Sequence, residues 1–161
     1  MFQVEQDVFY PLYGIVRIDS IEDTGFSGKK EQFYVFNTKG SKIMAPVERS
    51  QELGIRAIKT EKELQEFVDH LKQSVVLTGS TSWAERYANY LSLMKKGDPF
   101  SIPDIIKDLY WQNKEGNISS AKEKEVWNRL YHNLLEEVAY IQKSNRSLAN
   151  KFISKVIWET K

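Results

Sequence analysis

The chain has 161 residues, enough for one large domain or two small ones. Apolar residues make up 41% of it and charged residues 28%, which is typical of a globular protein, and no apolar run approaches the roughly 18 residues of a membrane span. The formal net charge of +1 does not fit a strongly basic nucleic-acid-binding protein. The lack of cysteine excludes a disulfide framework and a thiolate metal site, and it fits a cytoplasmic protein.

Short runs rich in Val, Ile, Phe and Tyr predict β-structure in residues 1–58. The turns between them fall at residues 25–30 and 39–40, where glycine supplies the positive φ of a tight reversal. Pro46 ends the last strand, because proline has no amide hydrogen to donate. The strands are expected over residues 7–10, 13–21, 31–36 and 42–47. Four or five short strands at this spacing predict a small SH3- or Tudor-like β-barrel.

From Thr60 onward the apolar residues recur with a helical period. Thr60 and Glu63 form a capping box, and Ser101 and Ser120 are each followed by an acidic residue three positions later. Further helices are expected over residues 82–96, 101–116 and 120–142 and from Ser147, with a polar linker over 73–80. The sequence therefore predicts an α+β protein, with a β-barrel over 1–58 and a compact all-helical domain of four to five helices over 59–161.

Two of these helices carry apolar stripes whose composition bears on function. The second helix has Trp83, Tyr87, Tyr90, Leu91 and Met94 on one face, and the third has Ile102, Ile105, Ile106 and Leu109. Such stripes usually face a core, so a core role is the simplest interpretation of Trp83. The same interpretation holds for Trp111, Trp127 and Trp158.

Charge is distributed almost evenly along the chain. Residues 1–58 hold 7 basic and 8 acidic side chains, and the remainder holds 16 and 14. A β-domain of net charge −1 is a poor candidate for binding nucleic acid alone, and a helical domain of +2 needs a local patch or a helper to do so.

The sequence lacks the motifs that an enzyme of a common class would show. No phosphate-binding glycine loop, dinucleotide fingerprint, zinc-protease motif or nucleophile elbow is present. The two histidines, His70 and His132, fall on different predicted helices, and we see no carboxylate partner for either. We therefore predict no catalytic site, no metal site and no cofactor.

Short motifs along the chain resemble, in their order and spacing, those of the CarD family of bacterial transcription regulators. In the β-part these are Phe2-x-Val4, Val8-x-Tyr10-Pro11-x-x-Gly14, Gly28-Lys29-Lys30, Phe33-Tyr34-Val35, Met44-x-Pro46-Val47 and Leu53-Gly54-Ile55-Arg56. In the helical part they are Trp83-x-x-Arg86-Tyr87, Lys96-Gly97-Asp98, Asp108-Leu109 and residues 119–124. The resemblance implies a non-enzymatic protein whose Tudor-like domain holds RNA polymerase and whose helical domain touches promoter DNA.

The resemblance also implies a docking site for the N-terminal lobe of the RNA polymerase β subunit. An edge at the third and fourth predicted strands would accept a strand of the partner, because backbone groups at a sheet edge are unpaired. Apolar contacts beside that edge would come from Phe26, Ile43, Met44 and Pro46. Either Ile43 or Met44 is expected to face the core instead, because the two alternate along the strand.

For the helical domain the resemblance implies contact with the upstream edge of the melted promoter region. Trp83 would wedge against the minor groove, Arg86 would reach a phosphate, and Lys122 and Lys124 would add contacts near the start of the fourth helix. The chain departs from the family at Glu5-Gln6, where relatives have Gly-Asp. It also departs where relatives carry basic residues, at Glu85, Ala88, Trp111, Gln112 and Glu123.

These departures leave a second hypothesis open, that the helical domain binds a protein through its aromatic residues and does not contact DNA. A third hypothesis, a Tudor-like barrel that binds nucleic acid by itself, is disfavoured by the charge of residues 1–58. A monomer is the expected state, with a strand-swapped dimer as the alternative.

Overall fold

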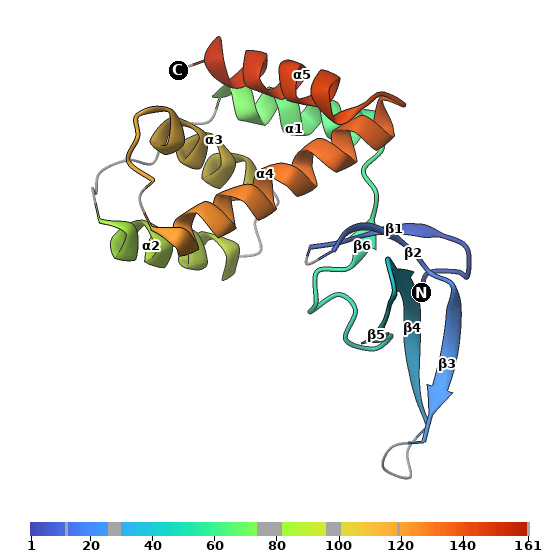
Figure 1. Ribbon diagram of the computed structural model, residues 1–161. Coiled ribbons are helices and arrows are strands. Elements are labelled where there is room, and N and C mark those ends of the chain that lie inside the picture. The colour runs from blue at the N-terminus through green and yellow to red at the C-terminus, as the bar shows by residue number, and fades with distance from the viewer. Residues whose placement is uncertain (12, 26–29, 74–81, 96–100, 119, 161) are drawn as a thin grey trace. The chain divides into compact units, whose positions relative to one another are not determined.

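The computed structural model describes the chain except for residues 12, 26–29, 74–81, 96–100, 119 and 161 (Figure 1). The chain divides into two compact units, Met1–Lys59 and Thr60–Lys161. The first unit contains strands and the second contains helices, so the predicted α+β class is confirmed.

The first unit holds two three-stranded antiparallel sheets. One has the order β2-β1-β6 and the other the order β3-β4-β5. Their bounds are β1 Asp7–Tyr10, β2 Gly14–Arg17, β3 Ser20–Thr24, β4 Glu31–Thr38, β5 Ser41–Pro46 and β6 Arg56–Ala57.

These sheets do not close into the predicted barrel. The strand expected over residues 13–21 is broken, because the chain changes sheets at Ile18 and Asp19. The amide of Ile18 donates to the carbonyl of Gln6 at 3.0 Å, whereas the amide of Asp19 donates to that of Val35, in the other sheet, at 2.8 Å. The strand β6 has only two residues and pairs with β1 over Val8 and Phe9 alone.

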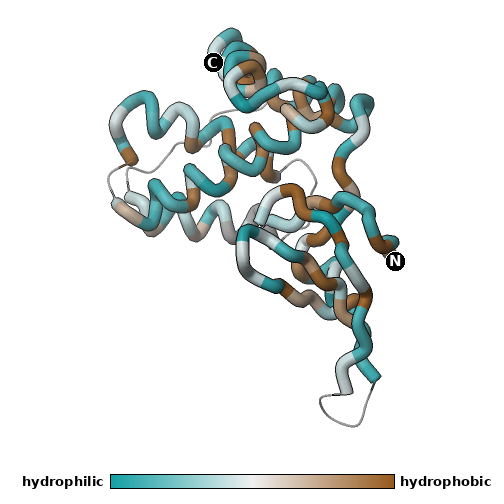
Figure 2. Tube along the Cα trace, turned by 45° about the vertical axis from the view of Figure 1, so that its right-hand side comes forward, coloured by the Kyte–Doolittle hydropathy of each residue, from teal (hydrophilic) through white to brown (hydrophobic). Residues whose placement is uncertain are grey.

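Both sheets nevertheless pack on one core. Hydrophobic residues run along the strands (Figure 2), and alternate ones, such as Val8 and Tyr10 of β1 and Tyr34 and Phe36 of β4, face this core. The buried side chains of this core are Val8, Tyr10, Val16, Ile18, Tyr34, Phe36, Ala45 and Ile55. The predicted turn at residues 39–40 is confirmed: Lys39 and Gly40 both have positive φ, and they join the paired residues Thr38 and Ser41.

The described residues of the second unit form five helices: α1 Glu61–Gln73, α2 Trp83–Lys95, α3 Ser101–Lys114, α4 Ala121–Ile141 and α5 Arg146–Trp158. Two predicted caps are confirmed. The amide of Thr60 donates to the Glu63 carboxylate at 2.7 Å, and the amide of Glu123 donates to the Ser120 hydroxyl at 3.1 Å. The fifth helix begins before Ser147, because Asn145 caps it by accepting from the amide of Leu148. The predicted end of α2 at Gly97 lies outside the described residues.

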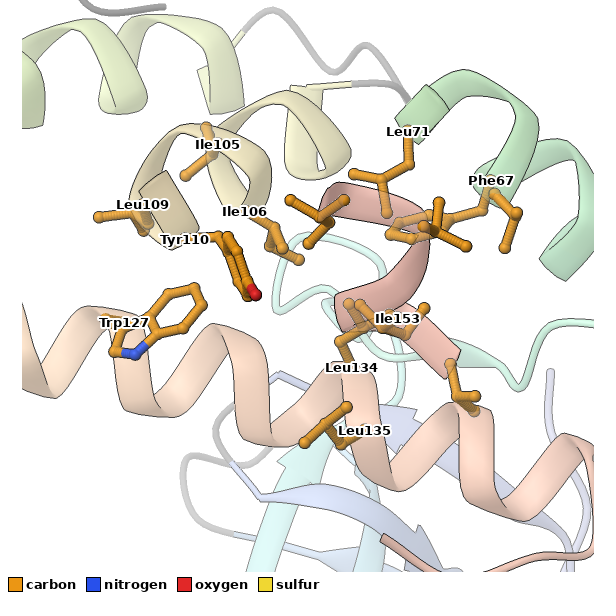
Figure 3. Close-up of a cluster of buried hydrophobic side chains, with 14 of the residues drawn as sticks. Phe67, Leu71, Ile105, Ile106, Leu109, Tyr110, Trp127, Leu134, Leu135 and Ile153 are labelled. Carbon is orange, nitrogen blue, oxygen red and sulfur yellow. The ribbon is translucent and has the colours of Figure 1, made fainter. Parts of the chain in front are cut away.

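An apolar cluster of described residues joins α1, α3, α4 and α5 (Figure 3), and Tyr90 of α2 also belongs to it. Phe67 and Leu71 of α1 meet Ile105 and Ile106 of α3 and Ile153 of α5 there. The predicted stripe of α3 is confirmed with one exception, since Ile102, in its first turn, is exposed.

The charged side chain of Lys107, on α3, is fully buried in this unit. Its ammonium donates to the carbonyl of Leu71 near the end of α1, at 3.1 Å, and to that of Thr160 just beyond α5, at 2.8 Å. A cation at the carboxyl ends of two helices satisfies carbonyls that have no partner within the helix. Burial lowers the pKa of the Lys107 amine.

Candidate docking and DNA-contacting surfaces

The candidate docking edge lies on the sheet β3-β4-β5. The strand β4 is the centre of that sheet, because Tyr34 pairs with Ile21 on one side and with Ala45 on the other. The third predicted strand, over residues 31–36, corresponds to β4, so the prediction that it lies at a sheet edge is wrong. The fourth predicted strand, over residues 42–47, corresponds to β5. Among the described strands β5 pairs with β4 alone, so β5 is an edge able to accept a further strand.

The alternation along β5 separates the predicted contact residues. Ile43 is half-buried and packs against the core of the first unit, whereas the side chain of Met44 is 37% exposed. Pro46 is half-buried at the end of the strand, opposite Phe33. Phe26 lies outside the described residues. Met44 is thus the exposed apolar side chain of this edge.

The candidate DNA-contacting surface begins with Trp83, the first residue of α2. Its ring is half-buried and packs against that of Tyr87, with centroids 5.1 Å apart, and against that of Tyr90, with centroids 6.3 Å apart. Tyr90 is buried, whereas Tyr87 is 39% exposed. The predicted stripe is therefore divided: Tyr90 is in the core, Tyr87 is exposed, and Trp83 is partly buried and packed against the core.

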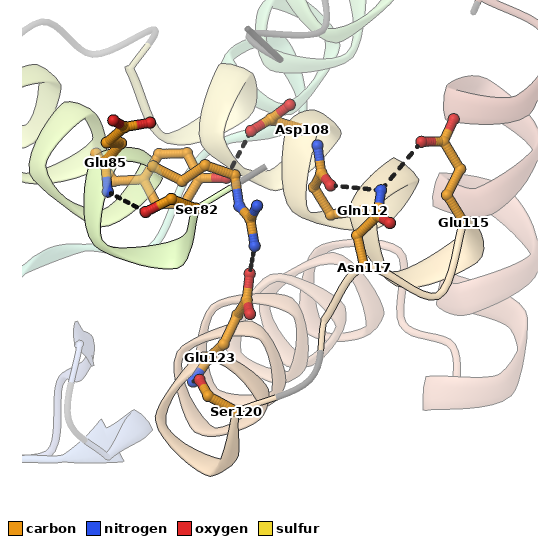
Figure 4. Close-up of polar contacts among 10 residues, drawn as sticks. Ser82, Glu85, Asp108, Gln112, Glu115, Asn117, Ser120 and Glu123 are labelled. Carbon is orange, nitrogen blue, oxygen red and sulfur yellow. Dashed lines mark hydrogen bonds and ion pairs between the residues drawn. The ribbon is translucent and has the colours of Figure 1, made fainter. Parts of the chain in front are cut away.

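Arg86, one turn further along α2, does not reach the solvent. Its side chain is 3% exposed and forms a salt bridge with Glu123, which is fully buried in the first turn of α4. Figure 4 shows Glu123 directed toward α2. Glu123 is one of the departures from the family pattern, and here it supplies the counter-charge for a buried cation.

Lys122 and Lys124 flank Glu123 and are both exposed. The salt bridge between Arg86 and Glu123 brings the first turn of α4 next to the first turn of α2. The two lysines therefore belong to the same part of the second unit as Trp83, close to the positive end of the α4 dipole.

A second buried polar contact attaches α2 to α3. The Tyr90 hydroxyl donates to the Asp108 carboxylate at 2.5 Å, and both residues are buried (Figure 4). Burial and this bond raise the pKa of the Tyr90 phenol far above its usual range. The hydroxyl therefore remains protonated, and able to donate, at all ordinary pH values.

Two of the other departures are not surface positions at all. Trp111 is 5% exposed and Gln112 is 3% exposed, and the Gln112 side chain accepts from that of Asn117 at 3.0 Å. Their identities follow from packing inside the second unit. Glu85 and Ala88 are exposed on α2, so the absence of basic residues at these two positions makes the surface of α2 less positive than in relatives.

Sequence reasoning missed the partners of both histidines. His70 lies 3.1 Å from Asp104 of α3, and His132 lies 2.8 Å from Glu136 one turn further along α4. The expectation that they had no carboxylate partner is therefore wrong. The i,i+4 spacing of His132 and Glu136 could have revealed the second pair. The described residues contain no group of three or more side chains able to hold a metal ion.

The fold and these surfaces define a class: a two-unit interaction protein, with a β-unit that has an accessible sheet edge and a helical unit that presents an aromatic and two lysines. No helix in the described part of the chain is long and apolar enough to cross a membrane.

Comparison with known proteins gives the family. The CarD-like/TRCF RID domain matches residues 2–59, and the C-terminal domain of CarD matches residues 66–154. The chain is also 26% identical over 144 residues to the protein of Bacillus subtilis (strain 168) named "Putative transcription factor YdeB", covering 88% of this chain and 93% of that protein. The chain belongs to the CarD-like family.

The resemblance seen in the sequence is thereby confirmed. Membership makes the chain a transcription-associated protein of the kind that interacts with RNA polymerase, and the domains of this family are interaction domains without catalytic activity.

Proposed function

We propose that this chain is a cytoplasmic, non-enzymatic transcription regulator that docks on RNA polymerase through its first unit and contacts promoter DNA through its second. The polymerase contact is the N-terminal lobe of the β subunit, and the DNA contact is the upstream edge of the melted region. The observation that carries the proposal is the half-buried Trp83 ring in the first turn of α2, a turn that is bonded to the first turn of α4, where Lys122 and Lys124 are exposed, in a chain that both family domains match.

Docking is proposed to occur by strand addition at β5. Unpaired backbone groups of an edge strand bind an added strand whatever its sequence, and side chains beside the edge supply the specificity. Met44 offers the exposed apolar contact. From the family resemblance, Ile43, Pro46 and Phe26 are proposed as further apolar contacts.

The DNA contact is proposed to combine a wedge with a few phosphate contacts. An apolar ring set against a distorted base step slows re-closing of the duplex and so changes the lifetime of the open complex. Two lysines give weak affinity alone, because affinity for DNA depends on the number of phosphates neutralised. Docking of the first unit on polymerase would supply the missing affinity as effective concentration.

The test of docking is calorimetric titration of the full chain with the isolated N-terminal lobe of the β subunit. Wild type is expected to bind with a Kd in the micromolar range or tighter. Met44→Glu places a charge beside the edge strand and is expected to weaken binding at least tenfold, about 1.4 kcal/mol. Val4→Glu changes an apolar side chain of the same unit that is 47% exposed and does not belong to β5, and it serves as the matched control. Equal binding by both variants would contradict docking at β5.

A second function is favoured by the exposed aromatic residues of the helical unit. Tyr140 is 49% exposed and Trp158 is 60% exposed, and such residues are enriched at protein interfaces. In this alternative the second unit binds a protein and not DNA.

A further inference from the structure

The inward face of α2, in its described part, combines aromatic rings with buried polar contacts. Among its described side chains the residues facing the rest of the unit are Trp83, Arg86 and Tyr90. Arg86 is bonded to Glu123 of α4, and Tyr90 is bonded to Asp108 of α3. The position of α2 on the other helices therefore depends on two buried polar contacts as well as on packing.

We infer that Arg86 is a positioning residue: its buried salt bridge with Glu123 fixes the first turn of α2 on α4 and so sets where the Trp83 ring meets the surface. The inference deepens the proposed function, on which it rests for the role of Trp83. It assigns to Arg86 a role different from the phosphate contact that the sequence suggested.

Burial is the first argument for this role. With 3% of the side chain exposed, the guanidinium could bind a phosphate only by leaving Glu123. That movement would leave a fully buried carboxylate without its counter-charge, which is among the most costly changes inside a protein. The neighbouring Lys122 and Lys124 are already exposed and require no such change.

Placement is the second argument. Trp83 is the first residue of α2, in the turn where a helix frays most easily, and its Ser82 cap is a long contact of 3.4 Å. Arg86 anchors this turn to α4, and the Tyr90 ring under Trp83 is anchored to α3 through Asp108. A ring held in one place binds without the entropic cost of ordering it, so the two anchors preorganise the wedge.

The experiment compares Arg86→Met, Glu123→Leu and the double variant in the full chain. Each single change breaks the buried pair, and the melting temperature is expected to fall by more than about 10 °C. The double change replaces the pair by apolar side chains of similar volume, and the melting temperature is expected to return close to that of wild type. The control is the exposed pair Glu125 and Arg129 on α4, altered to Leu and Met in the same way, which is expected to change it little.

The decisive measurement is binding of a forked promoter DNA by the complex of each variant with RNA polymerase, over a series of salt concentrations. If Arg86 positions the ring, the double variant binds within about twofold of wild type and with the same salt dependence, although it has no guanidinium. If Arg86 contacts a phosphate, the double variant binds more weakly and its slope against log salt falls by about one. That second result would overturn the inference.

A readout without DNA separates this inference from the proposed function. The indole N–H resonance of Trp83, assigned with Trp83→Phe, is expected to shift in Arg86→Lys, which keeps the charge but cannot reproduce the geometry of the guanidinium. The same resonance is expected to be unshifted in the control variant of Glu125 and Arg129. An unshifted resonance in Arg86→Lys would overturn the positioning role even if DNA binds. Absence of DNA binding by the wild-type complex, together with a shifted resonance, would refute the proposed function alone.

Discussion

Trp83 shows how one side chain serves two environments. Its ring makes an edge contact with the buried ring of Tyr90 and lies tilted against the ring of Tyr87, which is exposed. A core residue would be covered on both sides, and a simple surface aromatic would lack the support beneath. The partly supported ring is the arrangement that a wedge requires, because it must keep its shape while it displaces a base step.

The first prediction concerns this ring. Trp83→Ala is expected to leave binding to the β-subunit lobe unchanged, because the docking edge belongs to the first unit. It is expected to reduce the change that the protein causes in open-complex lifetime about fivefold or more, since contacts of one ring with bases contribute roughly 1–3 kcal/mol. The lifetime is measured by decay of heparin-challenged open complexes. Trp158→Ala, at an exposed tryptophan of α5, is the control, and equal effects of the two variants would contradict the wedge.

The carboxyl ends of α3 and α4 have the same type of helix termination, in one case with glycine and in the other without it. Both helices end in the same pattern of carbonyl contacts. After α3 the amide of Asn117 donates to Gln112, and after α4 the amide of Ser144 donates to Ala139, each at 2.9 Å. The left-handed residue is Gly116 in the first case, with φ of 76°, and Lys143 in the second, with φ of 49°. Glycine adopts this conformation freely, whereas lysine is strained in it.

A stability prediction follows from that difference. Lys143→Gly is expected to raise the free energy of unfolding of the helical unit by about 1 kcal/mol, because it relieves the left-handed strain without removing a contact. Gly116→Ala is expected to lower it by a similar amount, and the two variants can be compared by urea denaturation followed by circular dichroism. A loss of stability in Lys143→Gly would show that the lysine side chain contributes more than its backbone costs.

The helices could be predicted from the sequence because their signals are local. The Thr60 capping box and the apolar period of Leu64, Phe67 and Leu71 act within a turn or two, and the structure has them as expected. The buried charges could not be predicted in this way. Arg86 and Glu123 are 37 positions apart, so nothing near either of them reveals that the other neutralises it. Lys107 was likewise missed, because its acceptors lie at the ends of two other helices.

The closed barrel was a wrong prediction for a related reason. A strand-like alternating run over 13–21 cannot show at which residue the chain leaves one sheet for another. The change at Ile18 and Asp19 depends on long-range partners, Gln6 and Val35, that the run itself does not contain. The candidate site was predictable only where exposure follows from local pattern, as for Lys122 and Lys124.

At the scale of the whole molecule, the two units have separate cores and different roles in the proposed function: the first docks on polymerase and the second contacts DNA. In the proposed function, a chain of net charge +1 would bind DNA weakly by itself at physiological salt, and docking of the first unit on polymerase would bring the second unit to the promoter. The protein should therefore increase the affinity of polymerase for a forked promoter. The salt dependence of this increase should reflect the few phosphate contacts of the protein, and the magnitude of the increase should depend on docking.

The last prediction measures that added affinity, as the ratio of fork binding by polymerase with and without the protein. With contacts from Lys122 and Lys124 only, the ratio is expected to fall about tenfold between 50 and 200 mM salt, since each neutralised phosphate contributes a slope of roughly 0.9. Replacing both lysines by Gln should remove most of this dependence. Replacing Lys151 and Lys155, two exposed lysines of α5, should leave it unchanged. A ratio that does not change with salt would instead favour an aromatic protein interface, because such an interface has few charges for salt to screen.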